Sequence, residues 1–452
     1  MISLPEQFIH SLKDVMSEDE IQDFILHLEQ PSATSIRFNP YKTSQKPDLE
    51  NIPWSKYGFY LPHRPSFTLE PEFHSGAYYV QESSSMFVEH IVRECFDKDE
   101  NITALDLCAS PGGKTTLLSS IVGLESVVHA NEVIRQRAQT LADNVKKWGL
   151  GNVIVTNNDP SHFDSSREFY DLILVDAPCS GEGMFRKDKA AREQWSADNV
   201  ELCAARQKRI LSQIWQSLKP GGILIYSTCT FNRKENEENI KWLTSEYDCE
   251  KVDISCHDEW NITQTESNGH GCFRFFPGKI PGEGFFVSVV RKADDKIRTK
   301  LSKSRREVFE NLNNKERSEL KTWFNQGELM HTVRANDKIY TYYGQGYERI
   351  KQIAERYSVV YSGIEMGQFF NSKFKPEHPL ALFFDINKTK VNACFLSKED
   401  AQDFLRKKDI SAENFEQGLN LVCYNNLPLG WAKRIQNRVN NLYPKELRIM
   451  NL

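Results

Sequence analysis

Hydrophobic residues in the middle of the chain form short runs that alternate with amphipathic stretches. The runs lie at residues 102–107, 126–131, 152–157, 170–176 and 222–227. Short apolar runs that alternate with helical patterns are typical of parallel strands joined by crossover helices. The pattern therefore predicts an α/β fold with a doubly wound, Rossmann-like core over residues 101–293.

The helix before the last of these runs is the clearest one. Its apolar positions share one face, and Lys219-Pro220-Gly221-Gly222 then ends it. These positions are Leu211, Ile214, Trp215 and Leu218. After the following strand, Asn232 and Glu235 resemble a capping box and predict another helix. Cys229 is therefore expected between a strand end and a helix start, where the positive end of the helix dipole stabilises a thiolate.

The pattern changes on both sides of this core. Residues 1–100 show a helical pattern at Glu20–Leu28 and then an aromatic, proline-containing stretch. Residues 294–307 are polar and basic, which predicts a linker. Residues 308–371 and 372–452 mix aromatic, β-branched and basic side chains with short predicted strands. We expect an N-terminal region and two small C-terminal modules of the α+β type around the core.

The composition narrows the class of protein. The 452 residues are 39% hydrophobic and 26% charged, as in ordinary globular proteins. No apolar run is long enough to span a bilayer, and the first residues lack a signal-peptide core, so we expect a cytoplasmic protein. The ten cysteines form no CxxC pair, which argues against a metal site and against a disulfide framework. The net charge of −5 argues against indiscriminate coating of nucleic acid.

The sequence LDLCASPGGKTT places a glycine turn between an apolar strand and a helix. Such a turn lets backbone N–H groups approach a nucleotide-like ligand. The candidate ligand-binding residues of this turn are Cys108, Ala109, Ser110, Pro111, Gly112, Gly113 and Lys114. Glu132 ends the second strand, where a carboxylate can bind two ribose hydroxyls. Asp159 follows the third strand, beside the position expected for adenine.

Two other kinds of nucleotide site fit the turn less well. A P-loop requires a glycine where Cys108 stands, although Gly113-Lys114-Thr115 matches the end of that motif. A dinucleotide-binding oxidoreductase requires GxGxxG, which is absent. A turn that serves only packing is disfavoured by the acidic residues that follow successive strands.

Two cysteines are predicted to reach the ligand-binding edge of the sheet. Asp176 ends the fourth strand, Cys179 follows it, and Cys229 follows the fifth strand. Methylation of cytosine carbon 5 requires a thiolate to add first to carbon 6, because carbon 5 is otherwise a poor nucleophile. A carboxylate such as Asp176 can orient the base. Amino-methyltransferases typically have a Pro-Pro-aromatic turn here, which this chain lacks. The residues alone leave open which cysteine attacks.

Four longer motifs carry a resemblance to a known family. LDLCASPGGKT, VDAPCSGEGMFRKD, YSTCTFNRKENE and FFPGKIPGEGFFV resemble the motifs of the NOL/NOP/Sun family of RNA cytosine-5 methyltransferases. The resemblance implies a class I methyltransferase core with S-adenosylmethionine as the cofactor. It also implies that Cys229 is the nucleophile and that Cys179 assists release of the product. The cofactor contacts that it implies come from residues 108–114, Glu132, Asp159 and Asp176.

Flanking motifs resemble a bacterial subgroup of that family that methylates small-subunit (16S) ribosomal RNA. They are SIRFNP at residues 35–40, YYVQESSSM at residues 78–86 and LGWAKRIQNRVNNLYPKELRI at residues 429–449. The resemblance implies RNA binding by residues 1–100 and a PUA-like RNA-binding domain at residues 372–452. We expect RNA contacts from Arg186, Lys187, Lys433, Arg434 and Arg438, with stacking on Trp431 and Tyr443.

The expected partner is ribosomal RNA or the small ribosomal subunit, bound by a monomer. Two alternatives stay open at this point. The core motifs also suit a transfer RNA cytosine-5 methyltransferase. A catalytically silent RNA-binding protein of ribosome assembly would have the same fold, but it is expected to lack the cysteine after the fifth strand or the glycine turn, and this chain has both.

Overall fold

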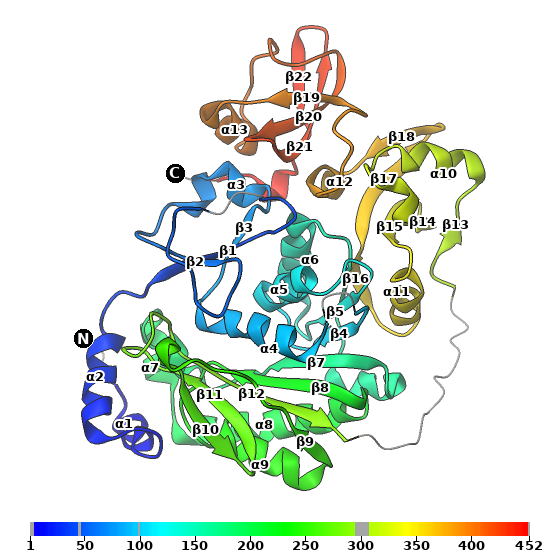
Figure 1. Cartoon of the computed structure of the whole chain (residues 1–452). Helices are drawn as coiled ribbons and strands as arrows, with labels where there is room; N and C mark the ends of the chain where they lie inside the picture. Colours follow the sequence, from blue (N-terminus) through cyan, green and yellow to red (C-terminus); the bar gives the residue numbers. More distant parts are fainter. Residues whose placement is uncertain (1–3, 44–46, 98–99, 294–306, 451–452) are drawn as a thin grey trace.

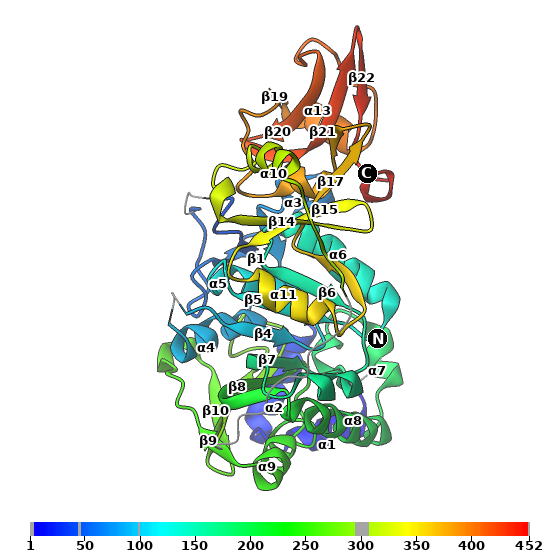
Figure 2. The same cartoon turned by 90° about the vertical axis from the view of Figure 1, so that its right-hand side faces the viewer.

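The structure is a computed structural model that describes residues 4–43, 47–97, 100–293 and 307–450 (Figure 1). All of the predicted linker except residue 307 lies outside these ranges. The molecule is elongated, with strand β22 (Arg438–Asn441) near one end and helix α9 (Glu237–Glu246) near the other (Figure 2). Between them lies a ten-stranded mixed sheet.

The strands of the large sheet are, in chain order, β4 (Thr103–Asp106), β5 (Val127–Asn131), β6 (Val153–Thr156), β7 (Tyr170–Asp176), β8 (Leu218–Thr228), β9 (Cys249–Lys251), β10 (Thr263–Ser267), β11 (His270–Phe275), β12 (Phe285–Lys292) and β16 (Val359–Ser362). Their spatial order is β10-β11-β12-β8-β7-β4-β5-β6-β16, with β9 paired to β12. The five predicted runs form β4 to β8, and these strands are parallel to their neighbours within that group. The predicted doubly wound core is therefore confirmed.

Helices cover both faces of this sheet because its strands are apolar on both sides. One face packs on α4 (Phe87–Cys95), α5 (Gly113–Ile121) and α6 (Arg135–Trp148). The other packs on α8 (Ala197–Trp215), α9 and α11 (Tyr347–Ala354). Within β4, Ala104 faces the first layer and Leu105 the second. A sheet buried on both faces accounts for continuous apolar runs instead of alternating ones.

Chain order reverses at β4, which lies between β5 and β7. Ligands of open α/β sheets bind beyond the carboxyl ends of the strands at such a switch point. β4 and its neighbour β7 end in Asp106 and Asp176. The topology therefore places the candidate site beyond these two aspartates.

The N-terminal region contributes helices and a small sheet. Its elements are α1 (Glu6–Leu12), α2 (Glu18–Leu28), α3 (Pro71–His74) and the three-stranded sheet of β1 (Thr34–Phe38), β2 (Gly58–Leu61) and β3 (Tyr78–Val80). The helix predicted at Glu20–Leu28 is α2, and its capping box is formed by Ser17 and Glu20. Phe24 of α2 packs edge-on against Phe231, with ring centroids 5.0 Å apart, so these helices cover the loop after β8.

The C-terminal part forms two further sheets. The five-stranded sheet consists of β13 (Glu310–Asn311), β14 (Met330–Ala335), β15 (Lys338–Tyr343), β17 (Ile364–Phe370) and β18 (Lys373–Pro376). The four-stranded sheet consists of β19 (Asn392–Phe395), β20 (Gly418–Tyr424), β21 (Leu427–Ile435) and β22. The helices of this part besides α11 are α10 (Asn314–Lys321), α12 (His378–Leu382) and α13 (Lys398–Leu405). The predicted boundary between residues 371 and 372 falls in the turn of the β17–β18 hairpin.

Candidate active site

The glycine turn forms one wall of a cavity at the switch point. β4 ends at Asp106, and α5 begins at Gly113 after Gly112, whose φ of 111° requires a glycine. The cavity has a volume of about 180 Å³. Its lining residues are Tyr79, Val80, Gln81, Glu82, Ser85, Asp106, Cys108, Ala109, Ser110, Pro111, Gly113, Lys114 and Asp176. Of the predicted turn residues, only Gly112 does not line it.

Ser110 fastens this turn to α6. Its hydroxyl donates to the Arg137 carbonyl at 3.0 Å, and the Arg137 guanidinium donates to the Ser110 carbonyl at 3.1 Å. These two hydrogen bonds hold the turn against the N-terminal part of α6.

Asp106 is a site residue that the sequence analysis missed. Its side chain is buried, its Oδ2 accepts a hydrogen bond from Thr115 at 2.7 Å, and its Oδ1 has no hydrogen-bond partner. Burial raises the pKa of Asp106 to about 7. A buried carboxylate oxygen without a partner at a cavity fits a ligand that brings a positive charge or an N–H group. The signal was an acidic residue that directly ends an apolar run, as at Asp176.

Glu132 and Asp159 lie after β5 and β6, but neither lines this cavity. Glu132 is buried and accepts a hydrogen bond from the Ile134 N–H at 3.0 Å. Asp159 is exposed and accepts from the Ser161 N–H and hydroxyl, at 3.0 and 2.7 Å. These hydrogen bonds lower the pKa of Asp159. Both carboxylates lie at the predicted edge of the sheet.

The structure brings the two predicted cysteines into contact. Cys179 follows β7, Cys229 follows β8, and their Sγ atoms are 3.1 Å apart. The pKa of Cys179 lies well above its ordinary value, because its thiol is hydrogen bonded to Cys229 and because it is buried. The two thiols therefore share a hydrogen bond in which either sulfur can be the donor.

A partly buried ion pair lies beside the cysteines. The Lys114 Nζ donates to Asp176 Oδ2 at 2.8 Å, and Ser227 donates to Asp176 Oδ1 at 2.8 Å. Burial alone lowers the pKa of Lys114, but the charge and hydrogen bond of Asp176, with a smaller contribution from Asp106, outweigh it and raise this pKa. The Lys114 ammonium is also close enough to Cys229 to interact with it electrostatically. Lys114 was predicted only as part of the cofactor turn.

Cys229 does lie between the end of β8 and the start of a helix, as expected, but the predicted cap residue of that helix is wrong. Asn232 does accept a hydrogen bond from the Glu235 N–H at 2.9 Å, but this pair closes a turn, and α9 begins only at Glu237 with Asn236 as its N-cap. The helix dipole acts within about one turn of a helix end. The positive charge near Cys229 therefore comes from Lys114 and not from α9.

The predicted RNA contacts near the cysteines differ in exposure. Arg186 is 9% exposed and donates to the carbonyls of His27 and Gly282, at 2.9 and 3.2 Å. It therefore joins α2 and the β11–β12 connection to the loop after β7. Lys187 is 45% exposed, and its Nζ lies 3.4 Å from the Glu283 carboxylate. Of the two, only Lys187 is placed to reach a phosphate.

The RNA contacts predicted in the C-terminal part also differ in how exposed and how free their side chains are. Lys433 and Arg438 are exposed on β21 and β22, whereas Arg434 donates to two backbone carbonyls. The expected stacking on Trp431 and Tyr443 is wrong, because these side chains are 2% and 3% exposed. Both belong to apolar clusters of the C-terminal part, so they stabilise its fold.

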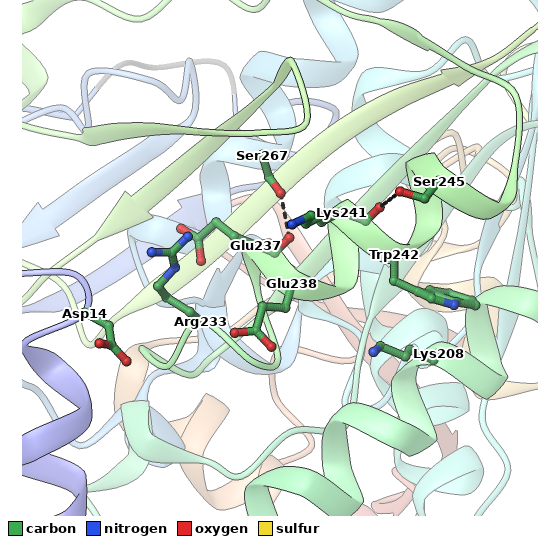
Figure 3. Close-up of a pocket in the computed structure, with 9 residues that line it drawn as sticks. All are labelled: Asp14, Lys208, Arg233, Glu237, Glu238, Lys241, Trp242, Ser245 and Ser267. Carbon is green, nitrogen blue, oxygen red and sulfur yellow. Dashed lines mark hydrogen bonds between the residues drawn. The ribbon is translucent and has the colours of Figure 1, made fainter.

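A larger cavity of about 640 Å³ lies away from the cysteines, between α8 and α9 (Figure 3). Its lining residues are Asp14, Lys208, Arg233, Glu237, Glu238, Lys241, Trp242, Ser245 and Ser267. The lining of this cavity includes both acidic and basic side chains but no cysteine. Within the described ranges there is no cluster of side chains suited to hold a metal ion. None of the helices there combines the length and apolar character that spanning a bilayer requires.

Three family models match successive parts of the chain. The model described as 16S rRNA methyltransferase RsmB/F matches residues 94–291. The N-terminal domain of 16S rRNA methyltransferase RsmF matches residues 4–83, and the methyltransferase RsmF PUA domain matches residues 391–449.

Similar proteins cover almost the whole chain. Ribosomal RNA small subunit methyltransferase F of Pectobacterium atrosepticum is 32% identical, over 98% of this chain and 96% of its own length. The protein of the same name from Klebsiella pneumoniae is 30% identical, over 99% and 97%. A methyltransferase homolog protein from Pyrococcus horikoshii is 27% identical with a TM-score of 0.50, over 64% of this chain and 100% of its own. NSun6 from the same organism, crystallised with SFG, is 20% identical with a TM-score of 0.54, over 64% and 99%.

The doubly wound sheet and the cavity at its switch point, together with these matches, define an S-adenosylmethionine-dependent methyltransferase. The unpartnered Asp106 carboxylate fits this cofactor, whose sulfonium and ammonium groups are cationic. The chain belongs to the ribosomal RNA small subunit methyltransferase F family.

Proposed function

We propose that this protein methylates carbon 5 of a cytosine in 16S ribosomal RNA and that Cys229 is the nucleophile. The observation that carries the proposal is the thiol pair, because the Sγ atoms of Cys179 and Cys229 share a hydrogen bond at 3.1 Å beside the Lys114 ammonium. A thiolate stabilised in this way is suited to attack carbon 6 of the ring. The names of the relatives support ribosomal RNA as the substrate.

Cys229 and Asp176 have different roles in the proposed reaction. The Cys229 sulfur forms a bond to carbon 6, which makes carbon 5 nucleophilic. S-adenosylmethionine supplies the methyl group as an electrophile on its sulfonium sulfur. Asp176 accepts hydrogen bonds from Lys114 and Ser227. Because a carboxylate has lone pairs for further hydrogen bonds, it can also accept one from the exocyclic amine of the cytosine. Loss of the carbon 5 proton then restores the double bond and expels Cys229 as a thiolate.

Cys179 is suited to accept that proton, because its pKa depends on the state of Cys229. The hydrogen bond with Cys229 and burial both raise the pKa of Cys179, so its thiol holds its proton before Cys229 reacts. Once Cys229 is bound to carbon 6, the influence of its thiol on Cys179 is lost, and Cys179 passes its own proton to solvent before it accepts the carbon 5 proton. The base therefore becomes available at the step that needs it.

We further propose that the cofactor contacts Glu132 and Asp159 beyond the cavity, in addition to residues 108–114 and Asp176. Residues 1–100 and 372–452 are proposed to bind RNA through exposed cations such as Lys433. Arg186 is proposed to act by holding the loop after β7. The protein is proposed to act as a monomer, because one chain supplies all of these groups, and in the cytoplasm, where ribosomal RNA is found.

The test is transfer of labelled methyl groups from S-adenosylmethionine to small-subunit RNA and, separately, to a transfer RNA pool. The wild type is expected to label a cytosine of the small-subunit RNA, and Cys229→Ala to label nothing. Cys203→Ala, which removes a buried thiol of α8, is the matched control and is expected to keep its activity. Labelling of transfer RNA alone would contradict the proposed substrate. Full activity of Cys229→Ala would contradict the proposed nucleophile.

A further inference from the structure

Two buried carboxylates connect the two cysteine loops crosswise. The β7 loop is residues 177–188, which follow β7, and the β8 loop is residues 229–236, which follow β8. Glu182 belongs to the β7 loop, and its Oε2 accepts hydrogen bonds from the backbone N–H groups of Phe231 and Asn232 in the β8 loop, at 2.7 and 3.1 Å. Phe231 and Asn232 follow Cys229 closely in the chain, with only Thr230 between.

Glu235 makes the reverse connection. It belongs to the β8 loop, and its Oε2 accepts from the N–H of Ser180, the residue after Cys179, at 3.0 Å. The same oxygen accepts from the Gln207 side chain at 2.7 Å, and Gln207 also donates to the Pro178 carbonyl at 3.0 Å. The residues on both sides of Cys179 are therefore anchored to Glu235, directly or through Gln207.

Both carboxylates are completely buried, and their partners are neutral donors. Besides the backbone groups, Glu182 accepts from the Trp195 indole and Asn232 amide, each at 3.0 Å, and Glu235 accepts from the same amide at 2.8 Å. Burial raises the pKa of Glu235. Neutral donors do not recover the whole cost of burying a carboxylate. An arrangement that destabilises the fold in this way is more readily explained by a role in the site.

The loops also touch directly where the carboxylates hold them. The Gly183 N–H donates to the Cys229 carbonyl at 2.7 Å, and the hydroxyls of Ser180 and Thr230 are 3.0 Å apart. A Cβ at residue 183 would lie 2.7 Å from that carbonyl, so the approach requires glycine. The side chains of the two cysteines share one S–H···S contact. The distance between the thiols is thus determined by the backbone connections on either side of them.

We propose that Glu182 and Glu235 are positioning residues that fix Cys179 against Cys229. Neither touches the reacting atoms. In their absence the β7 loop loses its anchors around Cys179, and the thiols separate. The consequence for catalysis rests on the proposed function: Cys229 can still attack the base, but Cys179 is displaced from the carbon 5 proton, and release of the covalent adduct slows.

The first test measures the thiol distance without RNA or cofactor. Diamide oxidises the two thiols, whose hydrogens pass to its N=N bond while one S–S bond forms, and peptide mass spectrometry quantifies the Cys179–Cys229 cross-link. We expect cross-linking to slow about tenfold or more in Glu182→Ala and Glu235→Ala, because a displacement near 1 Å has effects of this order on a proximity-dependent reaction. Glu235→Gln keeps an oxygen for Ser180, so an intermediate rate is expected.

Glu89→Ala is the matched control. Glu89 is also buried and accepts hydrogen bonds from Ser55, the Lys56 N–H and the charged Arg93 side chain, but it lies on α4, outside both loops. Its loss destabilises the fold without touching the cysteine loops, so its cross-linking rate is expected to equal that of the wild type below the melting temperature. Wild-type rates in both loop variants, or equal slowing in Glu89→Ala, would overturn the proposal.

The second test measures the lifetime of the RNA adduct in a single turnover. Glu235→Ala is expected to form the adduct and to resolve it at least about tenfold more slowly than the wild type. Release at the wild-type rate would overturn the catalytic consequence. If the wild type formed no adduct, the proposed function would fail, while the cross-linking test would still report on the positioning residues.

Discussion

Asp106 makes the affinity for S-adenosylmethionine dependent on pH. Its carboxyl is buried at the cavity with Oδ1 unpartnered, and its pKa is raised to about 7. A cationic cofactor binds best to the ionised form. For an acid with a raised pKa the ionised fraction grows as the pH rises through about 7, so the affinity grows in the same direction. The test lowers the pH from 8 to 6 and compares the change in cofactor affinity between the wild type and Asp106→Asn.

The magnitude follows from the ionised fraction. At pH 8 about 90% of the Asp106 carboxyls are ionised, and at pH 6 about 10%, so the dissociation constant rises about ninefold, or about 1.3 kcal/mol. Isothermal titration calorimetry in buffers of different ionisation enthalpy also counts protons. The wild type is expected to release close to one proton per cofactor at pH 6. Asp106→Asn is expected to release fewer and to lose most of the pH dependence. Equal pH dependence in both proteins would refute the reasoning.

Three further predictions concern residues outside the cysteine pair. Arg37 is buried and donates to Thr116 at 2.7 Å, so Arg37→Lys should lower the free energy of unfolding by about 2–3 kcal/mol, measured by urea unfolding; an unchanged midpoint would contradict this. Trp431→Ala should cost about 3–5 kcal/mol, because the side chain is core and not an RNA contact; weaker RNA binding at unchanged stability would contradict this. Lys433→Ala and Arg438→Ala should each reduce the salt dependence of RNA binding by about one unit; unchanged slopes would remove them from the interface.

The core was predictable because its signals are local. Each apolar run is a strand buried on both faces, so the runs matched β4 to β8 closely. The carboxyl ends of parallel strands lie at one edge of the sheet. The polar residues that follow these strands in the sequence therefore lie close together. The sequence alone therefore predicted that Asp176, Cys179 and Cys229 lie together.

The rest depends on contacts between distant segments. β16 adds an antiparallel edge to β6 from about two hundred residues further along, which no local pattern encodes. Trp431 lies in a basic segment, but its indole points inward and donates to Glu377. The crossed anchors at Glu182 and Glu235 join loops whose sequences look like ordinary polar turns. Asp106 was overlooked although its position resembles that of Asp176.

The central claim assigns different roles to the two cysteines. If Cys229 attacks and Cys179 assists release, Cys179→Ala should accumulate a covalent complex with RNA. The most direct measurement is therefore mass spectrometry of peptides from Cys179→Ala after reaction with small-subunit RNA and S-adenosylmethionine. The account predicts a methylated cytidine nucleotide attached to the peptide that contains Cys229, and none in the Cys229→Ala protein. An adduct on Cys179 in the Cys229→Ala protein would contradict the account.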